Sequence, residues 1–563
     1  MIWFGEAVYL NGSNFSALTT VKFGGVSVTP TYINENMISV TAPAVVDPQT
    51  VDITVTDEFG QTNTLTGGYV YNLPAPTVTS ITPNKGPLAG GQNVTVSGSG
   101  FVVGKTRFKQ IVAGGLHSCG VTDKGKVYCW GYNNYGQLGN NSTINNSIPV
   151  AVNISGVLAG KNIVAIAAAD YHTIALDSNG QVYTWGYNSS GQLGNNTTAN
   201  SSVPVAVNTT GVLAGKTIKA ISSRSAHNLA LDTNGQVYAW GSNAGGQLGN
   251  SSTVNSSVPV VVNTTGVLAG KTIVAVSANG SMSSYGNIYD SSMALDSNGL
   301  VYSWGSNLHG QLGNNSTTNS LVAVAVNTSG VLSGKFITKI ASGNSHVLAL
   351  DSNGLVYAWG YNGEGELGNN STTSSLVPVS VNTTGALAGK IISDISAGDH
   401  YSTAKDSTGH IYSWGYNGNG QLGNNTTTSS SVPVSVASTG VLSGKNISAI
   451  SAGGGLYGTN LASVLSHTLA LDTAGNIYSW GYNANGQLGN NSTAQSTVPV
   501  SVTPIYSGLP TLSLGGSLAT NVNVVNSTTL TATTSAHAAS LVDTTVTNYD
   551  TQSATLANSY NYK

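Results

Sequence analysis

Histidines recur along this chain at a nearly constant distance from a repeated tryptophan. Five lie thirteen residues before a tryptophan and a sixth lies fourteen before one; they are His117, His172, His227, His346 and His467, with His400 at the longer distance. A metal centre needs different ligands that converge on one point, whereas these histidines occur one per repeat. We therefore expect each to pack in a core or to make a hydrogen bond within its own repeat, and we predict no metal site.

The string Asp-Ser-Asn-Gly at residues 177–180 also recurs along the chain, as DTNG, DSNG, DSTG and DTAG, and each copy contributes one carboxylate. Calcium is one ligand that such a string could hold. No further carboxylate follows at the spacing of a calcium loop, and calcium needs several oxygen ligands. We interpret each string as a β-hairpin turn in which the glycine adopts a positive φ.

Arrangements typical of catalysis do not stand out. Carboxylates are almost confined to the repeated turns, and serine and threonine lie in low-complexity loops such as NNSTTNS. There is no recognisable Ser/His/Asp set, phosphate-binding loop or cluster of metal ligands. We predict a non-enzymatic protein without catalytic residues or cofactors, and we keep an enzyme with an unrecognised site as the alternative.

The chain has two cysteines, Cys119 and Cys129, in the stretch HSCGVTDKGKVYCWG. With Lys124 at the centre of the turn, the two residues face each other across a hairpin. A buried pair of thiols is one interpretation. The low charge content and the Ser/Thr/Asn-rich composition favour a disulfide instead, and with it an oxidising compartment.

The elements that must position these residues are set by a repeat. The phrase YTWGYNSSGQLGNN at residues 183–196 is one of seven related copies in the chain. The tryptophans of these copies are Trp130, Trp185, Trp240, Trp304, Trp359, Trp414 and Trp480. In the unit that begins at residue 163, the runs IVAIA, HTIAL, QVYTW and VPVAV are bounded by Gly, Asn and Ser clusters, which predicts four short strands. Seven such units predict an all-β, seven-bladed β-propeller, whose closure hides the sheet edges.

The words G-x-x-H-x-x-A-L, V-Y-x-W-G and G-Q-L-G resemble the repeat of the regulator of chromosome condensation family, whose members form seven-bladed propellers. We assign residues 105–507 to this propeller. The resemblance implies a ring that binds other proteins, with Trp185 and Leu193 of the phrase as packing residues. An intracellular exchange-factor-like regulator is a less favoured alternative, because the pI is near 6.3 and no basic tail is present.

The flanking segments predict immunoglobulin-like β-sandwich domains. VTVSGSGF at residues 94–101 nearly repeats VYLNGSNF at residues 8–15, and the copy resumes after the last blade. We therefore predict one sandwich over residues 1–73, incomplete at its start, and a second made of residues 76–104 and 508–563, with the propeller inserted between its strands. The stretch PTVTSITPNKGPLAGGQNVTVSGSGF resembles the IPT/TIG family, which implies a stalk or spacer of surface proteins.

Composition narrows the function further. Charged residues make up 7% of the chain and the net charge is −3, so no basic stripe is available for nucleic acid. No apolar run is long enough to span a membrane, and we predict no direct membrane insertion. We expect a secreted or cell-surface binding or adhesion module whose partner is another protein or a surface glycan.

A partner is expected on the end of the propeller opposite the site where the chain enters and leaves it. Two units are longer than the others because of SMSSYGNIYD at 281–290 and GGLYGTNLASVL at 454–465. The repeated phrase also varies at one pair of positions, which is Asn-Tyr at 134–135, Leu-His at 308–309 and Gly-Glu at 363–364. Variation on one face of a rigid ring is typical of a binding surface, although tolerated insertions would look the same. The candidate residues are Tyr135, Tyr285, Tyr289, His309 and Tyr457.

Overall fold

The structure, a computed structural model, describes residues 7–24, 26–43, 49–71, 75–101, 104–280, 290–456, 464–506, 508, 510–548 and 552–563. The chain divides into two compact units, residues 107–504 and residues 1–106 with 505–563, and each is described by itself. Apart from short 3-10 turns at Gly266–Leu268, Gly385–Leu387 and Gly440–Leu442, the regular elements over these ranges are β-strands. In this part of the chain no helix is long and apolar enough to cross a membrane. The predicted all-β class is confirmed.

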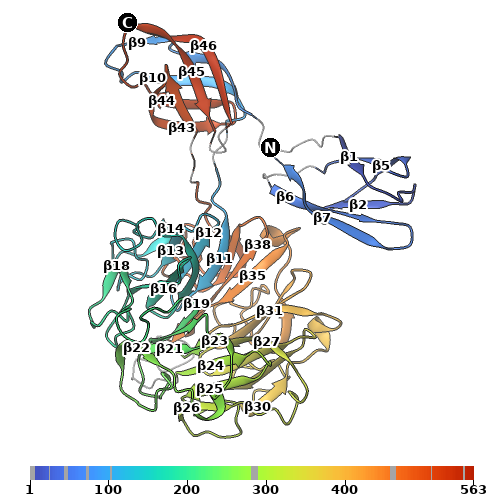
Figure 1. Cartoon of the computed structure of the whole chain (residues 1–563), viewed down its shortest axis with the longest axis vertical. Coiled ribbons are helices and arrows are strands. Elements are labelled where there is room, and N and C mark those ends of the chain that lie inside the picture. Colours follow the sequence, from blue (N-terminus) through green and yellow to red (C-terminus); the bar gives the residue numbers. More distant parts are fainter. Residues whose placement is uncertain are drawn as a thin grey trace. The chain divides into compact units, whose positions relative to one another are not determined.

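Seven four-stranded antiparallel sheets form the blades of the propeller in residues 107–504 (Figure 1). The strands, blade by blade, are β11 (Phe108–Ala113), β12 (His117–Thr122), β13 (Val127–Gly131) and β14 (Asn146–Ala151); β15 (Ile163–Ala168), β16 (His172–Asp177), β17 (Val182–Gly186) and β18 (Ser201–Ala206); β19 (Ile218–Arg224), β20 (His227–Asp232), β21 (Val237–Gly241) and β22 (Ser256–Val261); β23 (Ile273–Asn279), β24 (Ser291–Asp296), β25 (Val301–Gly305) and β26 (Ser320–Ala325); β27 (Ile337–Ser342), β28 (His346–Asp351), β29 (Val356–Gly360) and β30 (Ser375–Ser380); β31 (Ile392–Ala397), β32 (Tyr401–Asp406), β33 (Ile411–Gly415) and β34 (Ser430–Ser435); β35 (Ile447–Ala452), β38 (His467–Asp472), β39 (Ile477–Gly481) and β40 (Ser496–Ser501). A small hairpin, β36 (Gly455–Leu456) and β37 (Val464–Leu465), lies within blade seven.

The first strand of each blade lies nearest the axis of the ring. Consecutive first strands, from β11 to β35, contact one another, and β35 of blade seven returns to β11 of blade one (Figure 1). The second strand of each blade is buried along its whole length, as in His172–Asp177, because neighbouring blades cover both of its faces. This burial explains why HTIAL and its equivalents read as continuous apolar runs.

The repeated phrase forms the joint between neighbouring blades. The indole Nε1 of Trp185 donates to the carbonyl oxygen of Gln137 in the preceding blade at 2.9 Å, and Trp130 donates to Gln487 at 2.9 Å, which closes the ring through the same contact. The fully buried tryptophan packs close against the Gln-Leu-Gly glycine of the preceding blade, since a Cβ on Gly139 would lie 2.7 Å from Trp185 Nε1. The predicted packing role of the tryptophan is confirmed.

Each blade presents different connections at its two ends. We call the end formed by connections such as 169–171 and 187–200 the loop face. The other end, formed by hairpins such as 178–181 and links such as 207–217, is the hairpin face. The chain enters the propeller at the start of β11 and leaves after β40, so both crossings lie on the hairpin face.

The other unit contains strands of two sandwiches. The N-terminal one has a sheet of β1 (Ala7–Asn11), β5 (Met37–Thr41) and β4 (Thr31–Asn34), and a sheet of β3 (Val26–Val28), β2 (Thr20–Phe23), β6 (Gln49–Thr56) and β7 (Thr62–Tyr71). Its core includes Val21, Phe23, Ile38, Val40 and Ile53. Alternation of buried and exposed side chains along β2 is what two packed antiparallel sheets require.

Strands from both sides of the propeller pair with one another in the remaining two sheets. One contains β43 (Thr520–Asn526), β44 (Thr529–Thr533), β10 (Asn93–Ser99) and β8 (Thr77–Thr82), and the other β42 (Ser517–Leu518), β41 (Thr511–Leu514), β45 (Ser540–Thr547), β46 (Ser553–Tyr562) and β9 (Lys85–Gly86). Val96 of β10 lies opposite Leu530 of β44. Both belong to one apolar core with Leu512 and Val546.

Candidate functional site

The repeated aspartates serve the hairpins. In blade two, Asp177 Oδ1 accepts the backbone N–H groups of Asn179 and Gln181 at 2.9 Å each, and Oδ2 accepts the hydroxyl of Tyr183 at 3.0 Å. Burial, the hydrogen bond and the charge of Asp177 raise the pKa of Tyr183 to about 12. These contacts fix the turn, as the hairpin interpretation requires.

The repeated histidines join neighbouring blades, whereas the sequence led us to expect a contact within one repeat. His117 Nε2 lies 2.8 Å from Thr173 Oγ1 of blade two, and Thr173 in turn donates to the Gln137 carbonyl that also receives Trp185. The same arrangement closes the ring between His467 and Ser118, at 2.7 Å. Blade six has Tyr401 at this position, whose hydroxyl lies 2.8 Å from Thr468 Oγ1.

Burial keeps His117 and His467 uncharged at neutral pH. It lowers the pKa of His117 to about 3, with help from the charges of His467 and His172, and lowers the pKa of His467 to about 3. Thr173 uses its only proton on a carbonyl, so we assign the proton of His117 to Nε2. The histidines are therefore parts of the scaffold.

Cys119 and Cys129 lie directly opposite each other on β12 and β13. Their sulfur atoms are bonded at 2.07 Å, and both residues are fully buried in the core of blade one. Blade three has Leu229 opposite Ala239 at the same place. The pair thus occupies a packing position and presents no thiol to solvent.

The loop face of blades one and two carries a cluster of four tyrosines, Tyr132, Tyr135, Tyr171 and Tyr187, which we call the tyrosine cluster. The ring of Tyr135 lies 4.7 Å from that of Tyr187 and 5.3 Å from that of Tyr171. All four are half-buried, and the rings of Tyr132 and Tyr171 are 5.9 Å apart. Half-buried, mutually packed tyrosines offer a large contact area at a low cost in side-chain entropy.

A second cluster on the loop face is centred on blade five and contains His309, Tyr361, Glu364, Glu366 and His400; we call it the blade-five cluster. The ring of Tyr361 lies 5.0 Å from that of His309 and 5.4 Å from that of His400. His400 Nδ1 lies 3.1 Å from Glu366 Oε1, and Glu366 Oε2 accepts the backbone N–H of Glu364 at 2.9 Å. These contacts join loops from blades four, five and six.

Charge within the blade-five cluster is coupled. Burial raises the pKa of Glu366, against the hydrogen bond and charge of His400. Burial also lowers the pKa of His400, but the charge of Asp399 and the hydrogen bond to Glu366 outweigh it, so that this pKa is raised. We describe His400 and Glu366 as a buried ion pair.

Further buried charges lie where the axis of the ring meets the loop face. Arg224 donates from Nε to the carbonyl oxygen of Gly280 and from Nη1 to that of Ala397, both at 3.2 Å. These carbonyls belong to blades four and six, so the Arg224 side chain, from blade three, spans the centre of the ring. Asp290 and Asp399 are fully buried nearby, and burial raises the pKa of each.

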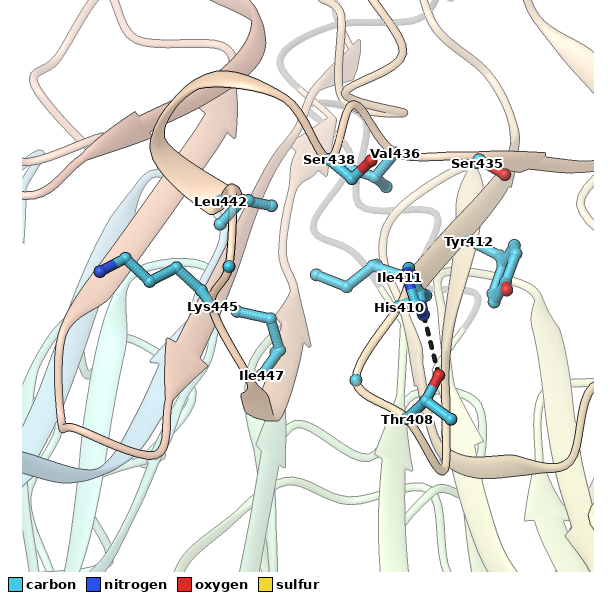
Figure 2. A pocket seen from close by; sticks show the side chains of 12 residues that line it. Thr408, His410, Ile411, Tyr412, Ser435, Val436, Ser438, Leu442, Lys445 and Ile447 are labelled. Atoms are coloured by element: carbon cyan, nitrogen blue, oxygen red, sulfur yellow. Dashed lines mark hydrogen bonds between the residues drawn. The ribbon is translucent and has the colours of Figure 1, made fainter. Parts of the chain in front are cut away.

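A pocket of about 350 Å³ on the hairpin face lies between the blade-six hairpin and the link to blade seven. Figure 2 shows His410 bonded to Thr408, at 2.8 Å, on one side of it, while the Lys445 side chain extends away from them. Leu442 and Ile447 supply much of its apolar wall. Thr408 Oγ1 also donates to Asp406 Oδ1 at 2.7 Å, so its proton is used within the blade-six hairpin turn.

Two of the five candidate partner-binding residues lie in these clusters: Tyr135 in the tyrosine cluster and His309 in the blade-five cluster. Tyr285, Tyr289 and Tyr457 lie outside the described residues. Sequence reasoning missed the neighbours of these residues in the clusters. One signal was available, because Glu366 replaces the glutamine that the other six copies of the phrase have at this place.

Family models match most of the chain. The RCC1-like domain model matches residues 84–458, and two models of the regulator of chromosome condensation (RCC1) repeat match residues 459–487 and 474–510. The IPT/TIG domain model matches residues 1–71. The resemblance of the repeated motifs to the regulator of chromosome condensation family is thus confirmed, and an IPT/TIG domain is found in the N-terminal segment. The second IPT/TIG-like sandwich, on residues 76–104 and 508–563, stays a prediction.

Known proteins share the propeller. The ultraviolet-B receptor UVR8 of Arabidopsis thaliana is 29% identical over 390 residues, which are 69% of this chain and 80% of the receptor. The human E3 ubiquitin-protein ligase HERC2 is 29% identical over 394 residues, but the match spans only 7% of that protein.

Solved structures agree with this fold. Human WBSCR16 superposes with a TM-score of 0.56 at 20% identity, over 73% of this chain and 99% of that one. Prp20p from Saccharomyces cerevisiae gives 0.52 at 23% identity, over 62% of this chain and 80% of that one. At such identities the likeness establishes the propeller fold.

Proposed function

Because the chain belongs to the RCC1-like domain family, we propose that it is a non-enzymatic binding protein whose propeller holds a protein partner on the loop face. The observation that carries this proposal is the tyrosine cluster, four packed and half-buried rings on the face opposite to both chain crossings. Tyrosine is enriched among the residues that dominate binding energy at protein interfaces.

The rigidity of the ring supports a binding role. Seven equivalent joints, each with a tryptophan bonded to the preceding blade, hold the loops in fixed relative positions. A surface that is ordered before binding loses little entropy when a partner docks. Prp20p, which shares this fold, is a protein whose binding to Gsp1p and histones has been studied, and a protein partner is the corresponding proposal here.

We further propose an extracellular or cell-surface setting. In this proposal the segments 76–104 and 508–563 form one sandwich domain, to which the propeller is joined by both its first and its last residues. Pairing of β10 with β44 supports the single domain. The buried cysteine pair and the 7% content of charged residues support an oxidising, extracellular location. Detection of the protein on intact source cells by surface-restricted biotinylation tests this location, and exclusive recovery from cytosol contradicts it.

The binding role is tested with the full chain as bait against extracts of the source cells. A variant with Tyr135→Ser and Tyr187→Ser alters the loop face, and a variant with Lys124→Ser and Lys126→Ser alters the hairpin face as the matched control. A protein captured by the wild type and by the hairpin-face variant, but about tenfold less by the loop-face variant, supports the proposal. Equal capture by all three proteins, or none by the wild type, overturns it.

A further inference from the structure

The loop face differs from the hairpin face in its content of cationic residues. In the part of the propeller that the structure describes, no loop-face connection contains lysine or arginine, since Arg224 is the last residue of β19. Carboxylates do lie in these connections, at Asp170, Asp290, Glu364, Glu366 and Asp399. Lysines instead recur in the links of the hairpin face, at Lys161, Lys216, Lys271, Lys335, Lys390 and Lys445. Of these carboxylates only Glu364 is not fully buried, so the part of the loop face around Glu364 is the part that suits a cationic partner.

Within this face the blade-five cluster combines carboxylates with aromatic rings. Glu364 is half-buried and accepts the hydroxyl of Ser429 at 3.2 Å. Its charge acts on two tyrosines of adjacent blades, because burial and the charges of Glu366 and Glu364 raise the pKa of Tyr361, and burial and the charge of Glu364 raise that of Tyr416. A carboxylate whose charge acts on two tyrosine side chains is an environment in which a guanidinium gains both an ion pair and cation–π contact.

A buried carboxylate lies beside this cluster. Asp399 is fully buried and directly precedes His400. Burial raises its pKa, and the charges of His400 and Arg224 and a hydrogen bond with the Asn344 side chain act against that rise. Burial of a carboxylate costs free energy, and an added cation at the cluster would offset part of that cost.

We propose that the blade-five cluster binds an arginine side chain from an extended segment of the protein partner. This inference rests on the proposed function and adds the chemistry of recognition to it. Arginine fits better than lysine because its planar guanidinium stacks on Tyr361 or Tyr416 while it donates two hydrogen bonds to a carboxylate such as that of Glu364.

The test uses variants that copy residues from other blades, so that each one has a precedent in this fold. Glu364→Ser introduces the Ser190 of blade two, and Tyr361→Ser introduces the Ser242 of blade three. Tyr482→Ser is the matched control, because Tyr482 has the same place in the repeat as Tyr361 but has no carboxylate in its loop and belongs to neither cluster. Thermal unfolding of each variant verifies that the propeller is intact.

The probe is a fluorescein-labelled peptide with three arginines spaced by glycine and serine, titrated with the full chain at about 50 mM salt. Versions with citrulline or glutamate in place of arginine have the same length without the positive charge. We expect the arginine peptide alone to bind. Glu364→Ser or Tyr361→Ser should weaken its binding about fivefold to tenfold, and Tyr482→Ser should leave it unchanged.

Equal binding of the citrulline and arginine peptides overturns the inference, and so does an arginine peptide that does not bind or whose affinity is the same for the wild type and Glu364→Ser. These results leave the proposed function standing if the Tyr135→Ser, Tyr187→Ser variant still loses the captured protein. Loss of arginine-peptide binding in the intact Glu364→Ser variant supports the inference separately from that capture experiment.

Discussion

Acid should destabilise the propeller through its buried histidines. Burial lowers the pKa of four of them, to about 3 for His117, His346 and His467 and about 4 for His172. Their ordinary value is 6.5. Below pH 6.5 the unfolded chain therefore binds protons that the folded chain does not, and the free energy of unfolding falls as the pH falls toward these lowered values.

The magnitude follows from the difference between the two states. At pH 5, one histidine with a pKa of 6.5 unfolded and about 3 folded removes about 2 kcal/mol from the free energy of unfolding. For His117 the physical cause is visible, since Nδ1 is buried without a hydrogen-bond partner among the described residues. A proton there would place an unpaired N–H in the core. Four such histidines remove about 8 kcal/mol together.

Some carboxylates act in the opposite direction. Burial raises the pKa of Asp290, Glu366 and Asp399, so the folded chain takes up protons there first and gains stability as the pH falls. The contribution of these carboxylates is the same in the wild type and in a variant that lacks one buried histidine, so it cancels when the two proteins are compared. The suitable variant is His117→Ser, because serine holds the same place in blade four as Ser291.

Equilibrium urea unfolding, followed by the fluorescence of the buried tryptophans, measures the effect at pH 7 and pH 5. The wild type should lose about 2 kcal/mol more than His117→Ser between the two values. Thr173→Val is the control, since it removes the hydrogen-bond partner of His117 but retains the titrating imidazole. The reasoning is refuted if His117→Ser and the wild type lose the same free energy, or if Thr173→Val behaves like His117→Ser.

Three further outcomes are expected. Trp240→Phe removes the N–H that binds the Gln192 carbonyl at 3.1 Å, so the free energy of unfolding in urea should fall by about 1 to 3 kcal/mol. An unchanged urea midpoint would contradict a stabilising role for this contact between blades. Protein exported through an oxidising compartment should have Cys119 and Cys129 resistant to alkylation until reduction, and cutting this ten-residue link should cost about 2 to 3 kcal/mol; two thiols that react before reduction would contradict this. Residues 508–563 alone should be protease-sensitive, because β44 loses its neighbour β10, and a resistant fragment would show independent folding.

The repeat made the propeller predictable, because each unit contains its strands, turns and tryptophan within one stretch of sequence. The joint between blades was not predictable to the same extent. Residues equivalent to His117 and Thr173 can be recognised in the repeats of the sequence. Their contact at 2.8 Å, however, requires that the second strands of neighbouring blades lie side by side. That placement depends on the curvature of the closed ring, which no single repeat determines.

The loop face could be predicted from topology, whereas its clusters could not. Alternating strand directions place the variable residues on one end of the ring, and this reasoning led to Tyr135 and His309. Tyr171 was missed because it lies in a different connection from Tyr135, and the two rings meet at 5.3 Å only through packing of blade two against blade one. This contact, too, forms only between two blades, so the sequence of a single repeat does not predict it.

Departures from the repeat separate the scaffold from the surface that we propose to be functional. The glutamine that precedes the repeated Leu-Gly is buried in six blades, and the equally buried Glu366 takes its place in blade five. A buried carboxylate there is costly without a positive partner, and His400, which has no equivalent histidine in the other blades, supplies that partner at 3.1 Å. Glu366 and His400 each depart from the repeat, and they pair with each other across neighbouring blades. We therefore treat them as a single structural feature. Because glutamine already makes the contact that this loop needs, as Gln192 does with the backbone N–H of Ser190 at 2.8 Å, folding alone does not require the pair. Its position beside Tyr361 and Glu364 on the loop face supports a role in binding.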